Sequence, residues 1–345
     1  MDFTRTEAAQ DLSGLVGTIV DAVCTPQHQR ELDGLEQRFD TALWGKLIDA
    51  DILSTAAPES VGGGGFGVLE QTAILAALGR GLAAAPYLES VILAAGALAR
   101  FGTPELREQW AGPAVAGEKI LTVALDGEFG QGPVQATAAG AGFRLTGNRT
   151  QVPFGPVADA FLVPAETDSG TKVFLVAAGD PGVSVTPLLT TGKNSSGELD
   201  LSGVEVGTDR IVGDTDVLAW LTTHKTLGLT AFQLGVLERA LELTAEYART
   251  REQFDRPIGS FQAVSARLAD DYIDIKGLGL ALVQASWRLS EDLPADLEVA
   301  TAAFWAAEAG HRVAHTTVHV HGGVGIDIDH QVHRYFLAAK QTEFA

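Results

Sequence analysis

The stretch Tyr247-Ala-Arg-Thr-Arg-Glu-Gln-Phe-Asp-Arg-Pro-Ile-Gly-Ser-Phe-Gln262 joins two long segments of helical periodicity. Pro257 helps to end one helix before the next begins, because proline lacks a backbone donor and resists the helix interior. The junction therefore holds Arg251 and Gln253 beside Phe254. A guanidinium held in this way suits a diphosphate, and the adjacent aromatic ring suits a nucleobase. The same residues also fit an ordinary helix terminus with cations near the negative end of its dipole, and both interpretations stay open.

Apolar residues recur at intervals of three and four on both sides of this junction, as they do along amphipathic helices. The stripe before the junction consists of Leu234, Leu237, Leu241, Thr244, Tyr247, Ala248 and Arg251. The stripe after it consists of Phe261, Val264, Leu268, Tyr272, Ile275 and Leu278. Because both helices are long and their seams apolar, residues 214–345 are predicted to form a four-helix bundle domain.

Two further domains are predicted before the bundle. Residues 119–213 contain short apolar or alternating runs between Gly, Pro, Asn and Asp, which is typical of a small β-sandwich or barrel. Residues 1–118 are predicted to be helical, with helices at 32–53 and from about Val68 to Leu82. The glycine run from Pro58 to Gly67 is interpreted as a loop between helices, because no strand precedes it as a phosphate-binding loop requires. The predicted fold class is α+β: helices, β-domain, helical bundle.

A second unusual stretch, His319-Val-His-Gly-Gly-Val-Gly-Ile-Asp-Ile-Asp-His330, follows near the end of the chain. Alternating histidines and carboxylates suggest a metal site, but neither a cysteine nor an ordered Glu-His pair supplies the remaining ligands, so no metal is expected. Gly322 and Gly323 instead permit a flat or charged ligand to approach the backbone closely, because a side chain there would obstruct it.

The composition limits the classes of partner. The 345 residues carry a formal net charge of −20 at pH 7, which argues against nucleic acid, since phosphate binding depends on Lys and Arg. Apolar runs such as that from Val91 to Ala99 are far shorter than the ~18 residues of a spanning helix, so no membrane partner is expected. The N-terminus lacks the features of a signal peptide and Cys24 cannot form an internal disulfide, which predicts a cytoplasmic protein.

The order of the three segments and these motifs together resemble the acyl-CoA dehydrogenase family. Residues 251–262 resemble its Arg-x-x-Phe-Gly-x-x-Ile-x-x-Phe-Gln signature, with Asp255 in place of the usual glycine. Residues 319–325 resemble its Gln-x-x-Gly-Gly-x-Gly loop, with His319 at the glutamine position. Residues 58–65 resemble its N-terminal Pro-Glu-x-x-Gly-Gly-x-Gly. The resemblance covers nearly the whole chain.

The resemblance implies an enzyme in which a glutamate removes the α-proton of an acyl-CoA while FAD accepts the β-hydride. It implies that the flavin ring lies against the β-domain of one subunit, and that the ADP half crosses to the C-terminal bundle of a neighbour. The positions that match the ADP half are retained and are the predicted FAD-binding residues: Arg251, Gln253, Phe254, Gln262, His319, Gly322 and Gly323.

The positions that match the ring half depart from the family pattern. The usual Thr-Glu-Pro-x-Ala-Gly-Ser-Asp corresponds to Ala-Leu-Asp-Gly-Glu-Phe-Gly at 124–130, and the Trp-Ile-Thr that packs on the ring corresponds to Gln-Val-Pro at 151–153. A proline thus replaces a hydroxyl donor. The place of the catalytic glutamate, six residues after Lys340, falls one past the end of the chain, and its alternative place aligns with Lys225. No catalytic residue is therefore predicted, because Glu343 is out of register.

This pattern resembles the non-catalytic β subunits of the actinobacterial heterotetrameric acyl-CoA dehydrogenases that shorten sterol side chains. The resemblance implies a catalytic α subunit in an α2β2 assembly, a steroid side-chain CoA thioester from cholesterol catabolism as substrate, and an electron-transfer flavoprotein or similar acceptor. The chain would then be inactive alone. Two alternatives remain: a self-sufficient homo-oligomeric dehydrogenase with an unrecognised base such as Glu343, and a flavin-free scaffold or binding protein.

Overall fold

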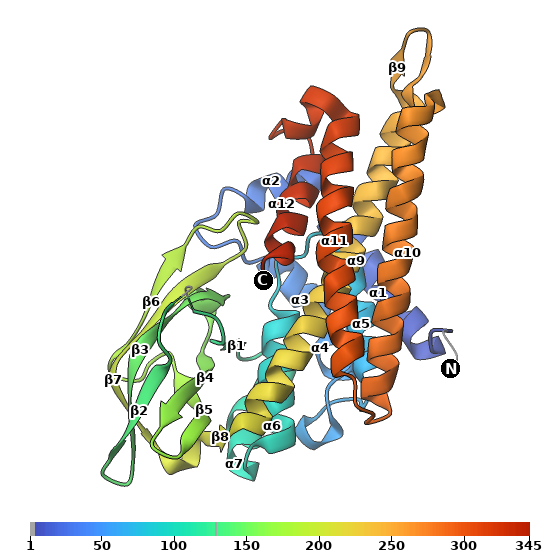
Figure 1. The fold of residues 1–345 in the computed structure, drawn as a ribbon. Coiled ribbons are helices and arrows are strands. Elements are labelled where there is room, and N and C mark those ends of the chain that lie inside the picture. The colour runs from blue at the N-terminus through green and yellow to red at the C-terminus, as the bar shows by residue number, and fades with distance from the viewer. Residues whose placement is uncertain (1–3, 128–129) are drawn as a thin grey trace. The chain divides into compact units, whose positions relative to one another are not determined.

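The computed structural model describes residues 4–127 and 130–345 (Figure 1). Helices come first, a mixed β-sheet follows, and helices return at the C-terminal end, which confirms the predicted α+β fold. Contacts divide the chain into two compact units, one made of residues up to 33, 68–83 and 226–345, the other of 34–67 and 84–225. Among the described residues, no helix is long and apolar enough to cross a membrane.

The first unit is a helical bundle. Its helices are α1 (Glu7–Val23), α2 (Pro26–Leu32), α5 (Val68–Arg80), most of α9 (Thr215–Thr250), α10 (Gln262–Ser290), α11 (Asp296–His321) and α12 (Val332–Glu343). A two-stranded hairpin, β9 (Glu252–Gln253) and β10 (Arg256–Pro257), connects α9 to α10, and a short 3₁₀ turn, η7 (Gly322–Ile326), follows α11. The predicted C-terminal helical bundle is thus confirmed, and so is a helix beginning at Val68.

Two glycines bring α5 and α9 into close backbone contact. A Cβ added at Gly79 would collide with the backbone oxygen of Phe232, and one added at Gly235 would collide with that of Ala76. Only glycine permits helices to approach this closely, because any side chain would hold the two backbones apart. The middle of α9 is therefore fixed against α5.

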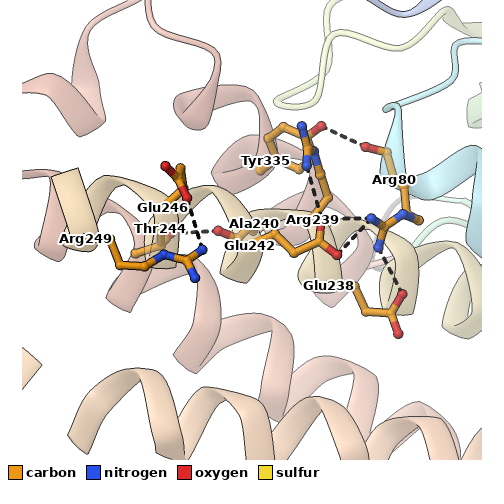
Figure 2. A network of polar contacts seen from close by, with 9 residues as sticks. All are labelled: Arg80, Glu238, Arg239, Ala240, Glu242, Thr244, Glu246, Arg249 and Tyr335. Carbon is orange, nitrogen blue, oxygen red and sulfur yellow. Dashed lines mark hydrogen bonds and ion pairs between the residues drawn. The ribbon is translucent and has the colours of Figure 1, made fainter. Parts of the chain in front are cut away.

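A polar network holds α9 against its neighbours (Figure 2). Arg80 of α5 pairs with Glu242 at 2.8 Å and with Glu238 at 3.3 Å, and Arg239 also pairs with Glu242 at 3.1 Å. Burial opposes ionisation of Glu242, but the hydrogen bonds and charges of the two arginines outweigh it and lower its pKa. The Tyr335 hydroxyl of α12 donates to the backbone oxygen of Arg80 at 2.7 Å. Ion pairs and hydrogen bonds thus join α5, α9 and α12.

The apolar stripe predicted along α10 is only partly correct. Ile275 and Leu278 are buried as expected, but Tyr272 is 56% exposed. The preceding residue, Asp271, is buried in its place, with a hydrogen bond to Thr316 of α11. Burial, together with two neighbouring carboxylates, raises the pKa of Asp271 to about 7. An acidic residue in a helix interior gives no apolar signal, so the stripe could not show it.

The second unit contains a mixed eight-stranded sheet in the order β6-β7-β3-β2-β4-β5-β8, with β1 paired to β4. Its strands are β1 (Leu121–Val123), β2 (Val134–Ala139), β3 (Gly142–Pro153), β4 (Ala160–Thr167), β5 (Gly170–Ala177), β6 (Val183–Leu188), β7 (Ser196–Gly207) and β8 (Ile211–Gly213). The pairs β1–β4 and β2–β4 are parallel and the others antiparallel. One apolar cluster that includes Phe161 and Phe174 forms its core.

Short helices complete this unit: α3 (Thr41–Asp49), α4 (Ile52–Thr55), α6 (Gly96–Phe101), α7 (Pro104–Leu106), α8 (Gly112–Val115) and two π-helical segments, η2 (Tyr87–Ala95) and η3 (Arg107–Ala111). The N-terminal part of α9, up to Lys225, also belongs to it.

The single helix predicted at 32–53 is wrong. The helical segment ends at Leu32, and a new helix begins after Asp40, whose side chain caps it by accepting from the Leu43 amide at 2.9 Å. Asp51, with a φ of 54°, breaks the segment again. The glycine run is confirmed as a loop between helices, where a Cβ at Gly63 would collide with the Ala57 backbone.

Candidate functional site

The hairpin between α9 and α10 carries the first predicted cluster (Figure 1). The Arg251 amide donates to the Tyr247 oxygen, and the Ile258 amide donates to the Arg251 oxygen, both at 2.8 Å. Its backbone is therefore anchored while its side chain is exposed, as is that of Gln253. No ion pair joins Arg251 to a carboxylate in the part of the chain that the structure describes. The guanidinium is thus available to an anion.

A two-residue turn sets the hairpin tip. Gln253 pairs with Arg256, which leaves Phe254 and Asp255 as the turn. Both have left-handed backbones, with φ of 55° and 61°, as a type I′ turn requires. The family signature has glycine where Asp255 stands, and glycine adopts this conformation without the steric cost that other residues incur. The family's glycine is therefore explained by turn geometry.

Aromatic and cationic groups support the tip. The Phe254 ring is 86% exposed and meets the Phe261 ring edge-to-face, with the centroids 6.1 Å apart. The Arg256 guanidinium lies over the Phe261 ring, 4.1 Å from its centroid. Edge-to-face rings and a cation over a ring face are both attractive arrangements. The hairpin thus presents an exposed aromatic face.

The second predicted cluster lies at the end of α11. Gly322 has a φ of 60° and a ψ of −137°, a region that glycine alone adopts readily. Gly325 is required by packing, because a Cβ there would lie 2.7 Å from the Val318 oxygen. Gly323 differs from both, since it has no positive φ and a Cβ there would meet nothing within 4 Å. Neither strain nor crowding in this chain explains a glycine at 323.

A stack of rings joins the two clusters at one end of the bundle. Tyr247 of α9 stacks on His321 of α11, with ring centroids 4.4 Å apart, and His330 lies 5.3 Å from His321. The Nδ1 of His321 lies 2.8 Å from the Thr317 oxygen and donates to it. Burial lowers the pKa of His321 and favours its neutral form. The ends of α9 and α11 therefore lie side by side, with Gly322 directly after the stack.

The other predicted residues lie at the same helix ends. Gln262 is the first residue of α10, and His319 lies in the last turn of α11; both are exposed. The structure thus places five of the seven predicted residues on the two connections, α9 to α10 and α11 to α12, and the other two in the adjoining helix turns. Tyr247 was recognised only as a stripe residue, and the imidazole of His321 gave no signal of its contact with it.

The positions that match the ring half lie in the second unit, and two of them, Asp126 and Pro153, accept hydrogen bonds from other residues of this chain. Lys225 of α9 donates to both carboxylate oxygens of Asp126, at 2.8 and 2.6 Å. Asp126 lies in the loop after β1, within the predicted ring motif; Glu128 and Phe129 of that motif lie outside the described residues. Thr122 of β1 donates to the Pro153 oxygen at 2.6 Å, so the proline at the ring-packing position is also in contact with β1.

Two more charged residues flank this pair. Glu89 of η2 is partly buried; its loss of solvation raises its pKa to about 7, although the nearby charge of Lys225 opposes the shift. Arg149 of β3 is buried, and its charge interacts with Asp126. Its Nη1 donates to the Gly132 and Asn148 oxygens, and its Nε has no hydrogen-bond partner. The sequence marks Lys225 and the segment that contains Asp126 only through their departure from the family pattern, and it does not indicate Glu89 or Arg149.

Glu343 is also engaged. It accepts from Lys340 at 2.5 Å and lies 3.1 Å from the Nδ1 of His311. Burial favours its neutral form, but the hydrogen bonds and charges of these two partners outweigh it and lower its pKa. A carboxylate with a lowered pKa and occupied oxygens is a poor proton acceptor.

A mixed sheet inserted between two helical segments of the chain, with a hairpin after α9 and a diglycine loop after α11, is the arrangement of the acyl-CoA dehydrogenase fold. Two family profiles match the chain: the acyl-CoA dehydrogenase N-terminal domain at residues 6–118 and the acyl-CoA dehydrogenase C-terminal domain at residues 215–345. The chain therefore belongs to the acyl-CoA dehydrogenase family, whose members bind FAD.

Individual relatives agree with this assignment. The chain is 74% identical to acyl-CoA dehydrogenase FadE27 of Mycobacterium tuberculosis, covering 100% of this chain and 95% of the relative. It is similar to a chain in the crystal structure of the ChsE4-ChsE5 complex from M. tuberculosis, with a TM-score of 0.98, 75% identity and coverage of 100% and 94%. It is also similar to a chain in the structure of the Tcur3481-Tcur3483 steroid ACAD G363A variant, with a TM-score of 0.92 and 37% identity. The match covers 98% of this chain and 93% of the other.

Proposed function

We propose that this chain is a subunit of a heteromeric FAD-dependent acyl-CoA dehydrogenase, in which it binds the ADP half of the FAD whose ring lies in a partner subunit. The observation that carries the proposal is the diglycine loop, where Gly323 is free of strain and crowding within the chain. A glycine that its own chain does not require fits a ligand that approaches the backbone from outside.

The residues at the bundle end fit an adenosine diphosphate. The exposed Arg251 guanidinium would pair with the diphosphate, and the exposed backbone at Gly322 and Gly323 would lie against it. Phe254 offers a flat apolar face to the adenine. Gln253, Gln262 and His319 supply polar side chains at the same helix ends. When bound, FAD supplies the hydride acceptor for α,β-dehydrogenation.

The same proposal assigns no proton acceptor to this chain. Lys225 stands at one family position for the base, and an ammonium accepts no proton unless its pKa falls strongly. Glu343, the nearest alternative, is held by Lys340 and His311. The partner would therefore supply both the base and the ring half of the flavin site.

Exposed apolar side chains on the bundle support an assembly with another subunit. Ile273 and Leu280 lie seven residues apart on α10 and are 64% and 57% exposed, and Leu297 and Phe304 repeat this spacing on α11. Residues seven apart lie on one helix face, so each helix presents an apolar strip. The ChsE4-ChsE5 and Tcur3481-Tcur3483 structures are each named for two components, which supports a partner subunit. In this proposal the partner is a catalytic α subunit in an α2β2 assembly.

The substrate class rests on similarity. One of the similar structures is described as a steroid ACAD, which favours a steroid side-chain CoA thioester over a simple fatty acyl-CoA. The catalytic α subunit would bind most of that substrate, and an electron-transfer flavoprotein or similar acceptor would reoxidise the flavin. The division into domains at 1–118, 119–213 and 214–345 stays a prediction.

The proposal is tested by purifying the chain alone and co-expressed with the dehydrogenase encoded beside it. The chain alone should be colourless and inactive, and the complex should be yellow and lose its flavin absorbance when a steroid acyl-CoA is added without an electron acceptor. A yellow, active chain on its own would instead support a self-sufficient dehydrogenase. A stable complex without flavin would support a scaffold.

A further inference from the structure

We infer that Lys225 fixes the loop after β1 from within the chain, so that an internal ion pair closes this chain's own ring half-site. The inference rests on the proposed function in one respect, namely that a ring bound by the family at this position is not bound here. It goes beyond it by naming a positioning residue, Lys225, and its partner, Asp126.

The contact is bidentate and partly buried. Lys225 bonds both oxygens of Asp126, and its side chain is only 18% exposed although that of Asp126 is 49% exposed. The two residues are 99 positions apart, so the pair joins α9 to a loop of the β-domain. Holding a long lysine side chain in one position costs conformational entropy. Packing within the unit already restricts the Lys225 side chain, so the contact with Asp126 costs little more.

The surrounding charges favour this arrangement. Arg149 places a second positive charge near Asp126, and Glu89 places a carboxyl near Lys225. The four side chains come from η2, the loop after β1, β3 and α9. Lys225 and Arg149 are cationic and Asp126 is anionic, and Glu89, with its pKa of about 7, adds partial negative charge at neutral pH. The attraction between opposite charges is screened less by solvent in a partly buried place than on an exposed surface. The loop is therefore held by side chains where a cofactor would otherwise hold it.

Hydrogen exchange on the complex tests the inference. In Lys225→Met, amides at residues 121–127 should exchange about fivefold faster or more, because the loop loses its anchor to α9. Asp126→Asn should have the same effect from the other side of the contact, and the double variant K225M/D126N should exchange no faster than either single variant, because both changes remove the same contact. Lys46→Met is the matched control, since Lys46 pairs with Asp49 at 3.9 Å on an exposed face of α3 in the same unit.

Removing flavin from the wild-type complex gives a second readout. Exchange at residues 121–127 should not change, because no ring is bound there, whereas exchange at Gly322–Ile326 should rise. Unchanged exchange in K225M and D126N would overturn the inference, as would faster exchange at 121–127 after flavin removal. Flavin content is measured separately by absorbance, so a failure of the proposed function is distinguishable from a failure of the ion pair.

Discussion

The η7 loop after α11 and the loop after β1 both resemble cofactor-binding segments of the acyl-CoA dehydrogenase family. They differ in whether their groups are bonded within this chain. At η7, Gly323 is open and exposed, and Arg251 at the same bundle end makes no ion pair with a described carboxylate. After β1, Asp126 is bound by Lys225. A half-site that serves an outside ligand keeps unsatisfied groups, whereas one that has lost its ligand satisfies its groups internally.

The largest effect is expected from Arg251→Ala. Removing a charge-assisted hydrogen bond to a diphosphate should weaken FAD retention by the complex by about 10- to 100-fold, measured by flavin release during dialysis. The melting temperature of the chain should stay unchanged, because Arg251 is exposed. Arg249→Ala is the control, since Arg249 pairs with Glu246 on the surface of α9. Equal FAD retention by wild type and R251A would remove Arg251 from the site.

Asp271→Asn tests the buried carboxyl in the bundle that carries the proposed ADP half-site. Because the folded pKa is about 7 and the ordinary value 3.8, the folded state binds the proton more tightly. The contribution of this group to stability should therefore be complete below about pH 4 and be lost as pH rises through about 7. D271N should remove this slope and stabilise the chain by about 1–2 kcal/mol at pH 8, since one carboxylate oxygen has no partner. Parallel pH profiles of melting temperature in the two proteins would contradict it.

Gly323→Ala and Gly325→Ala separate ligand binding from folding. Alanine at 323 meets open space, so stability should hold while FAD retention falls by about tenfold, because its methyl group occupies the ligand's side of the loop. Alanine at 325 meets the Val318 oxygen at 2.7 Å and should lower the melting temperature. If G323A also destabilised the chain, its glycine would have a structural reason after all.

The smallest effect is expected from Asp255→Gly. Glycine should stabilise the type I′ turn by about 0.5 kcal/mol, since it relieves the left-handed backbone of Asp255 at some cost in chain entropy. Slower amide exchange at Gln253 and Arg256 would show this. Faster exchange would mean that the Asp255 side chain stabilises the hairpin.

The sequence was most informative where local chemistry decides the structure. Pro257 and the glycines mark real connections, the stripe from Leu234 to Ala248 lies in one helix, α9, and the diglycine stretch ends α11. Prediction from the sequence failed where long-range packing decides the structure. The stripe at 32–53 continues through Leu35, but Asp40 is placed to cap a new helix and Leu35 is 51% exposed. Long-range packing also decides that Asp271 is buried and that Tyr272, predicted on the buried stripe, is exposed.

The cluster around Lys225 could not be predicted from spacing. Glu89, Asp126, Arg149 and Lys225 lie on four separate elements, and only the fold brings them together. The sequence showed only that Lys225 replaces a glutamate, not that it binds Asp126. Residues that match a motif can be recognised in the sequence. Contacts between residues far apart in the chain, such as Lys225 and Asp126, are visible only in the folded structure.

The most direct test of the two unlike half-sites is the flavin content of the co-expressed complex, measured as flavin absorbance per heterodimer after saturation with FAD. The account predicts one FAD per αβ pair, with the ring in the partner and the ADP half on this chain. Two FAD per pair would show that the ring half after β1 is functional and would contradict the account.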